Sequence, residues 1–128
     1  MTEHTRPTVL VVDDEPLVVE LVEQILKDDG YEVITATSGA QAVDVCAASD
    51  RHVDLLLTDV QMPEMTGRML AVTLGKSQLG MKVLYLTGHC EDLFTSLDLR
   101  PHEAFIKKPT TATALRSAVD LHLYLGRT

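Results

Sequence analysis

Residues 8–16 read TVLVVDDEP, and this stretch decides the fold. Residues 8–12 form a continuous, mostly β-branched apolar run, the pattern of a strand that is covered on both faces. Two aspartates and a glutamate follow at once, and Pro16 suits the first turn of a helix. A buried strand that leads through acidic residues into a helix predicts the first strand–helix unit of a parallel sheet.

The same alternation of short apolar runs and amphipathic stretches continues along the chain. Further strands are predicted at residues 31–35, 53–58, 81–86 and 104–107. Helices are predicted from Pro16 to a terminus near Gly30, from the cap Ser38 to about residue 48, at 68–74, at 91–97, and from a cap at Thr110 or Thr111 to residues 125–126. The first helix is expected to bury one face made of Leu17, Val18, Leu21, Val22, Ile25 and Leu26. Five such units predict a doubly wound α/β fold with helices on both faces of the sheet.

The size and charge of the chain limit the kinds of protein to which it can belong. Its 128 residues suit a single domain over 1–128, with a core at about 8–125. The net charge of −8 argues against direct binding of nucleic acid or anionic lipid. The apolar runs are far shorter than the ~20 residues of a membrane helix, and the amino terminus lacks the apolar stretch of a secretory signal. Cys46 and Cys90 have no metal-ligand spacing, and Cys46 lies in an apolar stripe, so a buried thiol and a reducing, cytoplasmic setting are expected.

Chemistry-bearing side chains stand at the predicted strand ends. The first strand runs into Asp13 and Asp14, and the third ends at Asp59. Thr87 ends the fourth, and Lys108 ends the fifth. In the strand order 2-1-3-4-5, the first and third strands are neighbours, so the three carboxylates meet at one edge with Thr87 and Lys108 beside them.

This combination predicts a site for a metal ion and a phosphoryl group. Clustered carboxylates repel one another, and a hard cation such as Mg²⁺ relieves that repulsion. Asp59 is placed as a nucleophile that accepts the phosphoryl group, with Lys108 and the Thr87 hydroxyl on its oxygens. Any one of these residues alone would be interpreted as a helix cap, a solvated lysine or a loop hydroxyl, and their joint occurrence at four strand ends favours the site.

Four stretches resemble the receiver domain of two-component response regulators over roughly residues 8–125. They are VLVVDDEP at 9–16, LLLTDVQMPEMTG at 55–67, VLYLTG at 83–88 and FIKKP at 105–109. The resemblance implies a flavodoxin-like (βα)5 fold, like that of the chemotaxis response regulators. It also implies that Asp59 is the phosphoacceptor.

The resemblance assigns roles to the other site residues. Asp14, Asp59 and the main-chain carbonyl of Gln61 would contact Mg²⁺, and Asp13 would act on the metal through water. Lys108 rather than Lys107 is the matching lysine, and a cis peptide is expected between Lys108 and Pro109. Thr87 and Phe105 occupy the switch positions. Phe105 has no hydroxyl, so only the packing half of that switch is expected.

The chain departs from the family pattern on the face that members use for partners. Residues 96–104 lack the usual Gly-Ala, and Pro101 excludes a long fourth helix there. Thr110 replaces a frequent Phe. Residues 121, 123, 124 and 125 are apolar and cannot all face one core, which leaves a loosely packed end, a homodimer or docking contact, or a junction to a fused module.

The function expected is that of a response regulator receiver in a two-component phosphorelay. It would accept a phosphoryl group from a sensor histidine kinase or a histidine phosphotransfer protein, dephosphorylate itself slowly, and signal by contact with a downstream protein. The receiver module of a hybrid histidine kinase is the alternative. An Mg²⁺-dependent aspartate phosphatase is disfavoured because Gln61 stands where such enzymes need a second acid. A flavodoxin-like cofactor site is disfavoured by the acidic residues 13–15, and a degenerate scaffold by the intact site residues.

Overall fold

Five parallel strands form one sheet in the order β2-β1-β3-β4-β5, which confirms the predicted order. The computed structural model describes residues 6–88, 99–108 and 110–125. Its elements are β1 (Thr8–Val12), α1 (Pro16–Asp28), β2 (Glu32–Ala36), α2 (Gly39–Ser49), β3 (Leu55–Asp59), α3 (Gly67–Gly75), β4 (Lys82–Thr87), β5 (Glu103–Lys107) and α5 (Ala112–Leu125).

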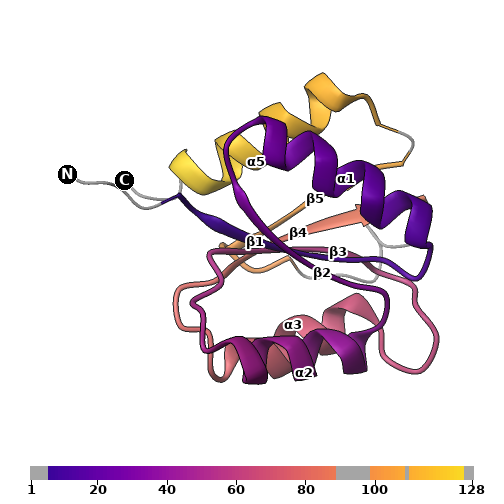
Figure 1. Ribbon diagram of the computed structural model, residues 1–128, viewed down its shortest axis with the longest axis vertical. Coiled ribbons are helices and arrows are strands. Elements are labelled where there is room, and N and C mark those ends of the chain that lie inside the picture. The colour runs from indigo at the N-terminus through magenta and orange to yellow at the C-terminus, as the bar shows by residue number, and fades with distance from the viewer. Residues whose placement is uncertain (1–5, 89–98, 109, 126–128) are drawn as a thin grey trace.

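Helices cover both faces of the sheet (Figure 1). α1 and α5 lie on one face, and α2 and α3 lie on the other. All five residues of β1 are buried because alternate side chains enter opposite core layers. Val9 and Val11 pack on the α1/α5 side, whereas Leu10 and Val12 pack on the α2/α3 side. The central strand therefore needs apolar residues at every position, as its sequence predicts.

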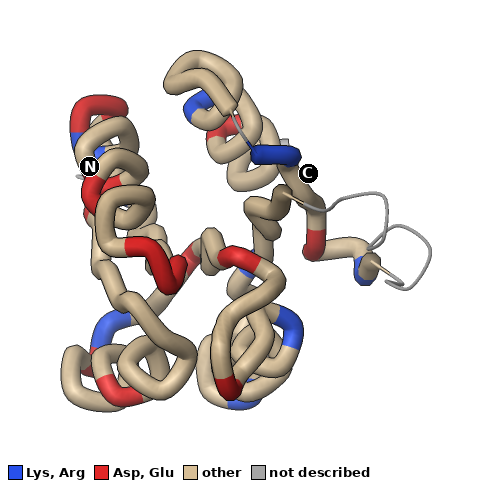
Figure 2. Tube along the Cα trace, turned by 90° about the vertical axis from the view of Figure 1, so that its right-hand side faces the viewer, with Lys and Arg blue, Asp and Glu red and all other residues tan. Residues whose placement is uncertain are grey.

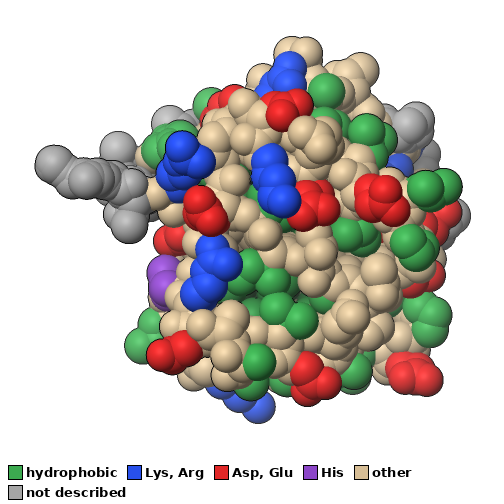
Figure 3. Space-filling view, in the orientation of Figure 1, with side chains coloured by type: hydrophobic (Ala, Val, Ile, Leu, Met, Phe, Trp, Pro, Cys, Tyr) green, Lys and Arg blue, Asp and Glu red, His purple; other side chains and the backbone are tan. Residues whose placement is uncertain are grey.

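The buried face of α1 differs from the predicted one. Val19, Val22 and Leu26 are the buried residues, whereas Leu17 is 79% and Leu21 63% exposed. Apolar residues cover more of the helix circumference than the sheet and α5 occupy, so those two leucines extend into solvent. Hydrophobic side chains are accordingly visible at the surface among acidic ones (Figure 3).

The predicted caps lie close to the observed helix ends. The Ser38 hydroxyl accepts a hydrogen bond from the Gln41 amide, as an N-cap should. Thr111 caps α5 through a 3.0 Å bond from the Ala114 amide, so Thr111 rather than Thr110 is the cap. Gly30 adopts φ +94° after the end of α1, a conformation that glycine reaches without strain.

The first strand has the predicted bounds, and the bounds of the other four differ from those predicted by at most two residues; Asp59 and Thr87 belong to β3 and β4. The helix expected at 91–97, Cys90 and the peptide bond to Pro109 lie outside the described residues. Cys46 is a buried free thiol, as expected. At the end of α5, Leu123 is buried while Leu121 and Tyr124 are exposed. Among the helices that the structure describes, none has the length and apolarity needed to cross a membrane.

Candidate functional site

The carboxyl ends of β1 and β3 bring the acidic residues together. The two strands are hydrogen-bonded neighbours, with Val12 paired to Thr58, so Asp13 and Asp59 emerge side by side. Figure 2 looks onto this edge of the sheet and shows acidic stretches of chain between the two helix layers. Asp13, Asp14 and Asp59 each offer a carboxylate oxygen, and these oxygens lie within 4.8 Å of one another.

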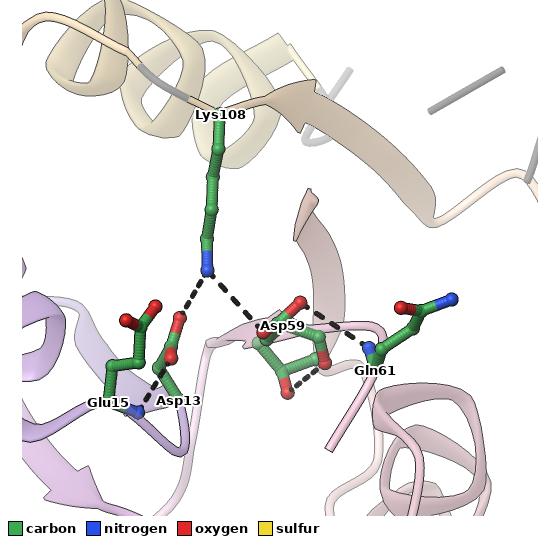
Figure 4. A network of polar contacts seen from close by, with 6 residues as sticks. Asp13, Glu15, Asp59, Gln61 and Lys108 are labelled. Atoms are coloured by element: carbon green, nitrogen blue, oxygen red, sulfur yellow. Dashed lines mark hydrogen bonds and ion pairs between the residues drawn. The ribbon is translucent and has the colours of Figure 1, made fainter. Parts of the chain in front are cut away.

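Asp13 is the most buried of the three carboxylates, and only 3% of its side chain is exposed. Its Oδ1 accepts a hydrogen bond from the Glu15 amide at 2.9 Å, which fixes the turn between β1 and α1. Its Oδ2 accepts from Lys108 Nζ at 2.7 Å (Figure 4). The role of the Glu15 amide was not predicted, because a backbone donor leaves no mark in the sequence.

Asp59 stands between a lysine and a backbone amide. Lys108 Nζ lies 3.4 Å from Asp59 Oδ2, and the Gln61 amide donates to Asp59 Oδ1 at 3.3 Å (Figure 4). Burial raises the pKa of the Asp59 carboxyl above its ordinary value, and the charge of Asp13 raises it further. Lys108 and the Gln61 amide act in the opposite direction but do not cancel the rise.

Lys108 is held between the two carboxylates, with 22% of its side chain exposed. Burial alone would lower the pKa of its ammonium group, but the hydrogen bond to Asp13 and the attraction of both aspartates raise it. Its backbone amide donates to the Thr87 carbonyl at 2.7 Å, which ties the end of β5 to the end of β4. Lys107 is exposed, so the structure places Lys108 and not its neighbour in the site.

The oxygen cluster can accept a metal ion. Asp14 is exposed, and Asp59 has 14% of its side chain exposed, so both carboxylates can be approached from solvent. Among the described residues, three carboxylates lie here with the one ammonium group of Lys108, which leaves an excess of negative charge on hard oxygen donors. Such donors are the ligands that divalent cations of the Mg²⁺ type prefer. Gln61 is exposed and follows Asp59 closely enough for its amide to contact the carboxylate.

Gly67 supports the site in a way that the sequence reasoning missed. A Cβ atom built on Gly67 would lie 2.1 Å from the Asp59 carbonyl oxygen, so a side chain at this position would displace β3 or α3. The Gly67 amide also donates to the Val60 carbonyl at 2.9 Å. A glycine between a strand and a helix is a weak signal of such a close backbone approach, so this role of Gly67 was not predicted.

The two expected switch residues lie on neighbouring strands. Thr87 is 1% exposed at the end of β4 and pairs with Lys107 of β5. Phe105 is half-buried and packs against the core cluster on the α2/α3 side. The structure thus brings Asp13, Asp14, Asp59 and Lys108 into one site, and places Thr87 and Phe105 on the strands that border it.

The chain is similar to known proteins over most of its length. The family model of the response regulator receiver domain matches residues 9–120. The transcriptional regulatory protein GlrR of Escherichia coli K12 is 35% identical over 119 residues, which cover 91% of this chain and 26% of GlrR. Sensor kinase CckA of Brucella abortus is 34% identical over 113 residues, or 88% of this chain and 12% of CckA. A receiver domain protein from Clostridium thermocellum superimposes with a TM-score of 0.79 at 26% identity, covering 94% of this chain and 97% of that one.

Proposed function

The chain belongs to the response regulator receiver domain family, and on that premise we propose that Asp59 accepts a phosphoryl group in an Mg²⁺-dependent reaction. The observation that carries this proposal is the convergence of three carboxylates and Lys108 from three separate strand ends. Neither the carboxylates nor the lysine are needed there to build the sheet, whose hydrogen bonds are made by the backbone.

The residues of the chain have distinct roles in this reaction. A carboxylate oxygen of Asp59 attacks the phosphorus atom, a P–O bond forms, and the bond to the donor breaks with its electron pair leaving on the donor. Lys108 Nζ, which lies farther from Asp59 than from Asp13, turns to the oxygens of the incoming group. When bound by Asp14, Asp59 and the Gln61 carbonyl, with Asp13 acting through water, Mg²⁺ supplies positive charge that offsets the charge of the phosphoryl group.

Thr87 and Phe105 would change position in response to the phosphoryl group. A phosphoryl group adds roughly −1.5 to −2 charge at neutral pH, so it biases groups that contact it directly. The Thr87 hydroxyl moves toward it, and Phe105 follows inward on the next strand. This shift selects one of two pre-existing arrangements of the site.

The test uses a small phosphodonor. Incubation with acetyl phosphate and Mg²⁺ should add one phosphoryl group, detected by mass spectrometry of the intact chain. Asp59→Asn should remove this product, and chelation of the metal should do the same. Undiminished phosphorylation of Asp59→Asn would overturn the assignment. Rapid release of inorganic phosphate over many turnovers would favour a phosphatase instead, because the proposal expects only slow autodephosphorylation.

The switch has its own measurement. Addition of beryllofluoride and Mg²⁺ should shift NMR signals from Asp59 through Thr87 to Phe105 and the start of α5. In Thr87→Ala, the shifts at Phe105 should shrink while those around Asp59 persist. Distal shifts that survive this substitution unchanged would exclude the hydroxyl as the route.

The physiological donor in this proposal is a sensor histidine kinase or a histidine phosphotransfer protein. The output is protein contact, by the chain alone or as a homodimer, in a reducing, cytoplasmic setting. A second candidate is a receiver module within a hybrid kinase that relays the group onward. It is favoured by CckA, a relative that is by name a sensor kinase and of which this chain spans only 12%.

A further inference from the structure

Tyr85 places a hydroxyl group in the core, next to the two expected switch residues. The side chain lies in β4 and is 0% exposed. Its Oη donates a hydrogen bond to Glu103 Oε2 at 3.1 Å. A buried hydroxyl that loses its acceptor costs free energy, so this bond constrains both residues.

Glu103 transmits this constraint to the turn before β5. Its second oxygen, Oε1, accepts a hydrogen bond from the Arg100 amide at 2.9 Å. The Glu103 amide in turn donates to the Arg100 carbonyl, also at 2.9 Å. The turn over residues 100–103 is therefore closed by two bonds and linked through one carboxylate to the interior of β4.

Tyr85 is adjacent to both expected switch residues. It precedes Thr87 by two positions on β4, so both side chains lie on the same face of the strand. It pairs directly with Phe105 in the register of β4 and β5. Tyr85 and Phe105 belong to the same core layer, on the α2/α3 side of the sheet.

The charges around the hydroxyl keep it a donor. Burial and the neighbouring Glu103 raise the pKa of Tyr85, while the guanidinium groups of Arg68 and Arg100 act in the opposite direction without cancelling the rise. The hydroxyl therefore stays protonated at neutral pH and continues to donate to Glu103.

We propose that Tyr85 is a positioning residue of the switch, whose hydroxyl couples the end of β4 to the Arg100–Glu103 turn through the Glu103 carboxylate. Phe105 has no hydroxyl group that could form a hydrogen bond from β5. Tyr85, on the neighbouring strand, has such a hydroxyl group and bonds Glu103 at the start of β5. Movement of Thr87 at the end of β4 is then transmitted two residues back along the strand, to Tyr85, and across to the turn. This inference rests on the proposed function, because it requires a phosphoryl-driven movement of Thr87.

The test compares amide hydrogen exchange with and without beryllofluoride and Mg²⁺. In the unsubstituted chain, the analogue should change exchange at the Arg100 and Glu103 amides. In Tyr85→Phe, these amides should exchange about fivefold faster without the analogue, and the analogue should change them little further. A purely structural role would raise exchange equally in both states and leave their ratio unchanged, which would overturn the proposal.

Tyr31→Phe is the matched control. Tyr31 is also buried, and its Oη also bonds a carboxylate, that of Asp120, but it lies on the opposite, α1/α5 side of the sheet. This variant removes the same kind of bond and should leave the response of the turn to the analogue intact. An equal loss of response in Tyr31→Phe would mean that general softening of the core explains the result.

Substitutions of Glu103 complete the cycle. Glu103→Ala also removes the acceptor of the Arg100 amide, so the quantity compared is the response of the turn to the analogue and not the exchange without it. Glu103→Ala should lose this response as Tyr85→Phe does, and the double variant should lose no more of it than Tyr85→Phe alone, because the response passes through the Tyr85–Glu103 bond. Glu103→Gln keeps an acceptor for Tyr85 and should retain the response. Additive losses in the double variant would overturn the coupling.

Acetyl phosphate separates the two proposals. Phosphorylation of Asp59 should be the same in Tyr85→Phe as in the unsubstituted chain, because the substitution removes only a hydroxyl that bonds Glu103 and leaves Asp59 and Lys108 in place. Failure of the unsubstituted chain to be phosphorylated would reject the proposed function. Normal phosphorylation together with an unchanged response of the turn in Tyr85→Phe would reject only this inference.

Discussion

At the amino ends of the strands, polar side chains are paired with backbone groups, whereas at the carboxyl ends three carboxylates lie together and two of them contact Lys108. Asp54, before β3, accepts from the Thr8 amide at 2.8 Å, and the Asp54 amide donates to the Thr8 carbonyl at 2.9 Å. Gln78 accepts from the Val53 amide at 2.8 Å. These side chains complete the ends of strands, which is a structural use of polarity.

The side of the sheet where the strands begin, here called the amino edge, also holds the end of α5; the side where they end is the carboxyl edge. Lys82 Nζ donates to the His122 and Leu123 carbonyls at 3.1 and 2.9 Å, where the negative end of the helix dipole favours a cation. His122 Nε2 lies 3.0 Å from the Val83 carbonyl and 2.9 Å from the His102 carbonyl. One lysine and one histidine thus join α5 to β4 and to the residue before β5.

At the carboxyl edge, repulsion between like charges lowers the stability of the folded chain. Asp13, Asp14 and Asp59 carry three negative charges against the one positive charge of Lys108, an excess of 3 − 1 = 2 negative charges. Repulsion of this kind is retained where function needs it. Substitutions at the two edges should therefore separate phosphorylation from stability.

The largest expected effect is at Asp14, the most accessible of the three carboxylates. Asp14→Ala should slow phosphorylation by acetyl phosphate at limiting Mg²⁺ by at least about 100-fold. Loss of a residue that only supports a metal ligand lowers metal affinity or activity by up to about 100-fold, and loss of a ligand itself should cost at least as much. Its unfolding midpoint in urea should not fall. Asp44→Ala, which removes an exposed acid from α2, should leave the phosphorylation rate unchanged. A normal rate in Asp14→Ala would remove this residue from the metal site.

A smaller effect is expected from the two adjacent lysines. Lys108→Ala should leave Mg²⁺ binding largely intact, but should shift the beryllofluoride-bound chain back toward its resting form by about tenfold, the value of a hydrogen bond to a charged group. Lys107→Ala should do much less because that side chain is exposed. NMR shifts at Phe105 measure the shift in equilibrium. The opposite ranking of the two variants would assign the site lysine to Lys107.

The sequence predicted the carboxyl edge better than the amino edge, for a physical reason. Asp13, Asp59 and Lys108 could be placed because parallel strands bring their carboxyl ends to one edge whatever the exact register. The pairs Tyr85–Glu103 and Tyr31–Asp120 could not be predicted. Their residues lie 18 and 89 positions apart in the sequence, respectively, and their contact depends on side-chain packing.

Periodicity also has a limit within single elements. The apolar pattern of α1 correctly predicted a helix, but Leu17 and Leu21 are exposed. The pattern gives the direction of the apolar face, and it does not give the width of that face that packs against the sheet. The strands predicted over residues 53–58 and 81–86 extend by one residue to Asp59 and Thr87, since backbone pairing continues through a polar residue.

At the amino edge, Lys82→Met should lower stability without changing phosphorylation. The substitution keeps an apolar stem and removes two hydrogen bonds to the end of α5, so the free energy of unfolding should fall by about 1 kcal/mol. Urea denaturation measures the loss, and Lys76→Met, at an exposed position, is the control. A normal stability in Lys82→Met would mean that water replaces the ammonium group at no cost.

The smallest effect is a gain in stability at the carboxyl edge. Because burial and Asp13 raise the folded-state pKa of Asp59, the folded chain binds the proton more tightly than the unfolded chain does. Stability is therefore lost as pH rises from the ordinary carboxyl pKa through the raised one, and the loss is complete above it. Asp59→Asn removes this titration. It should match the unsubstituted chain near about pH 3 and exceed its free energy of unfolding by about 0.5 kcal/mol near pH 7. If Asp59→Asn were instead less stable at neutral pH, the pairing of Asp59 with Lys108 would outweigh its repulsion from Asp13, and the carboxyl edge would be structural in the same sense as the amino edge.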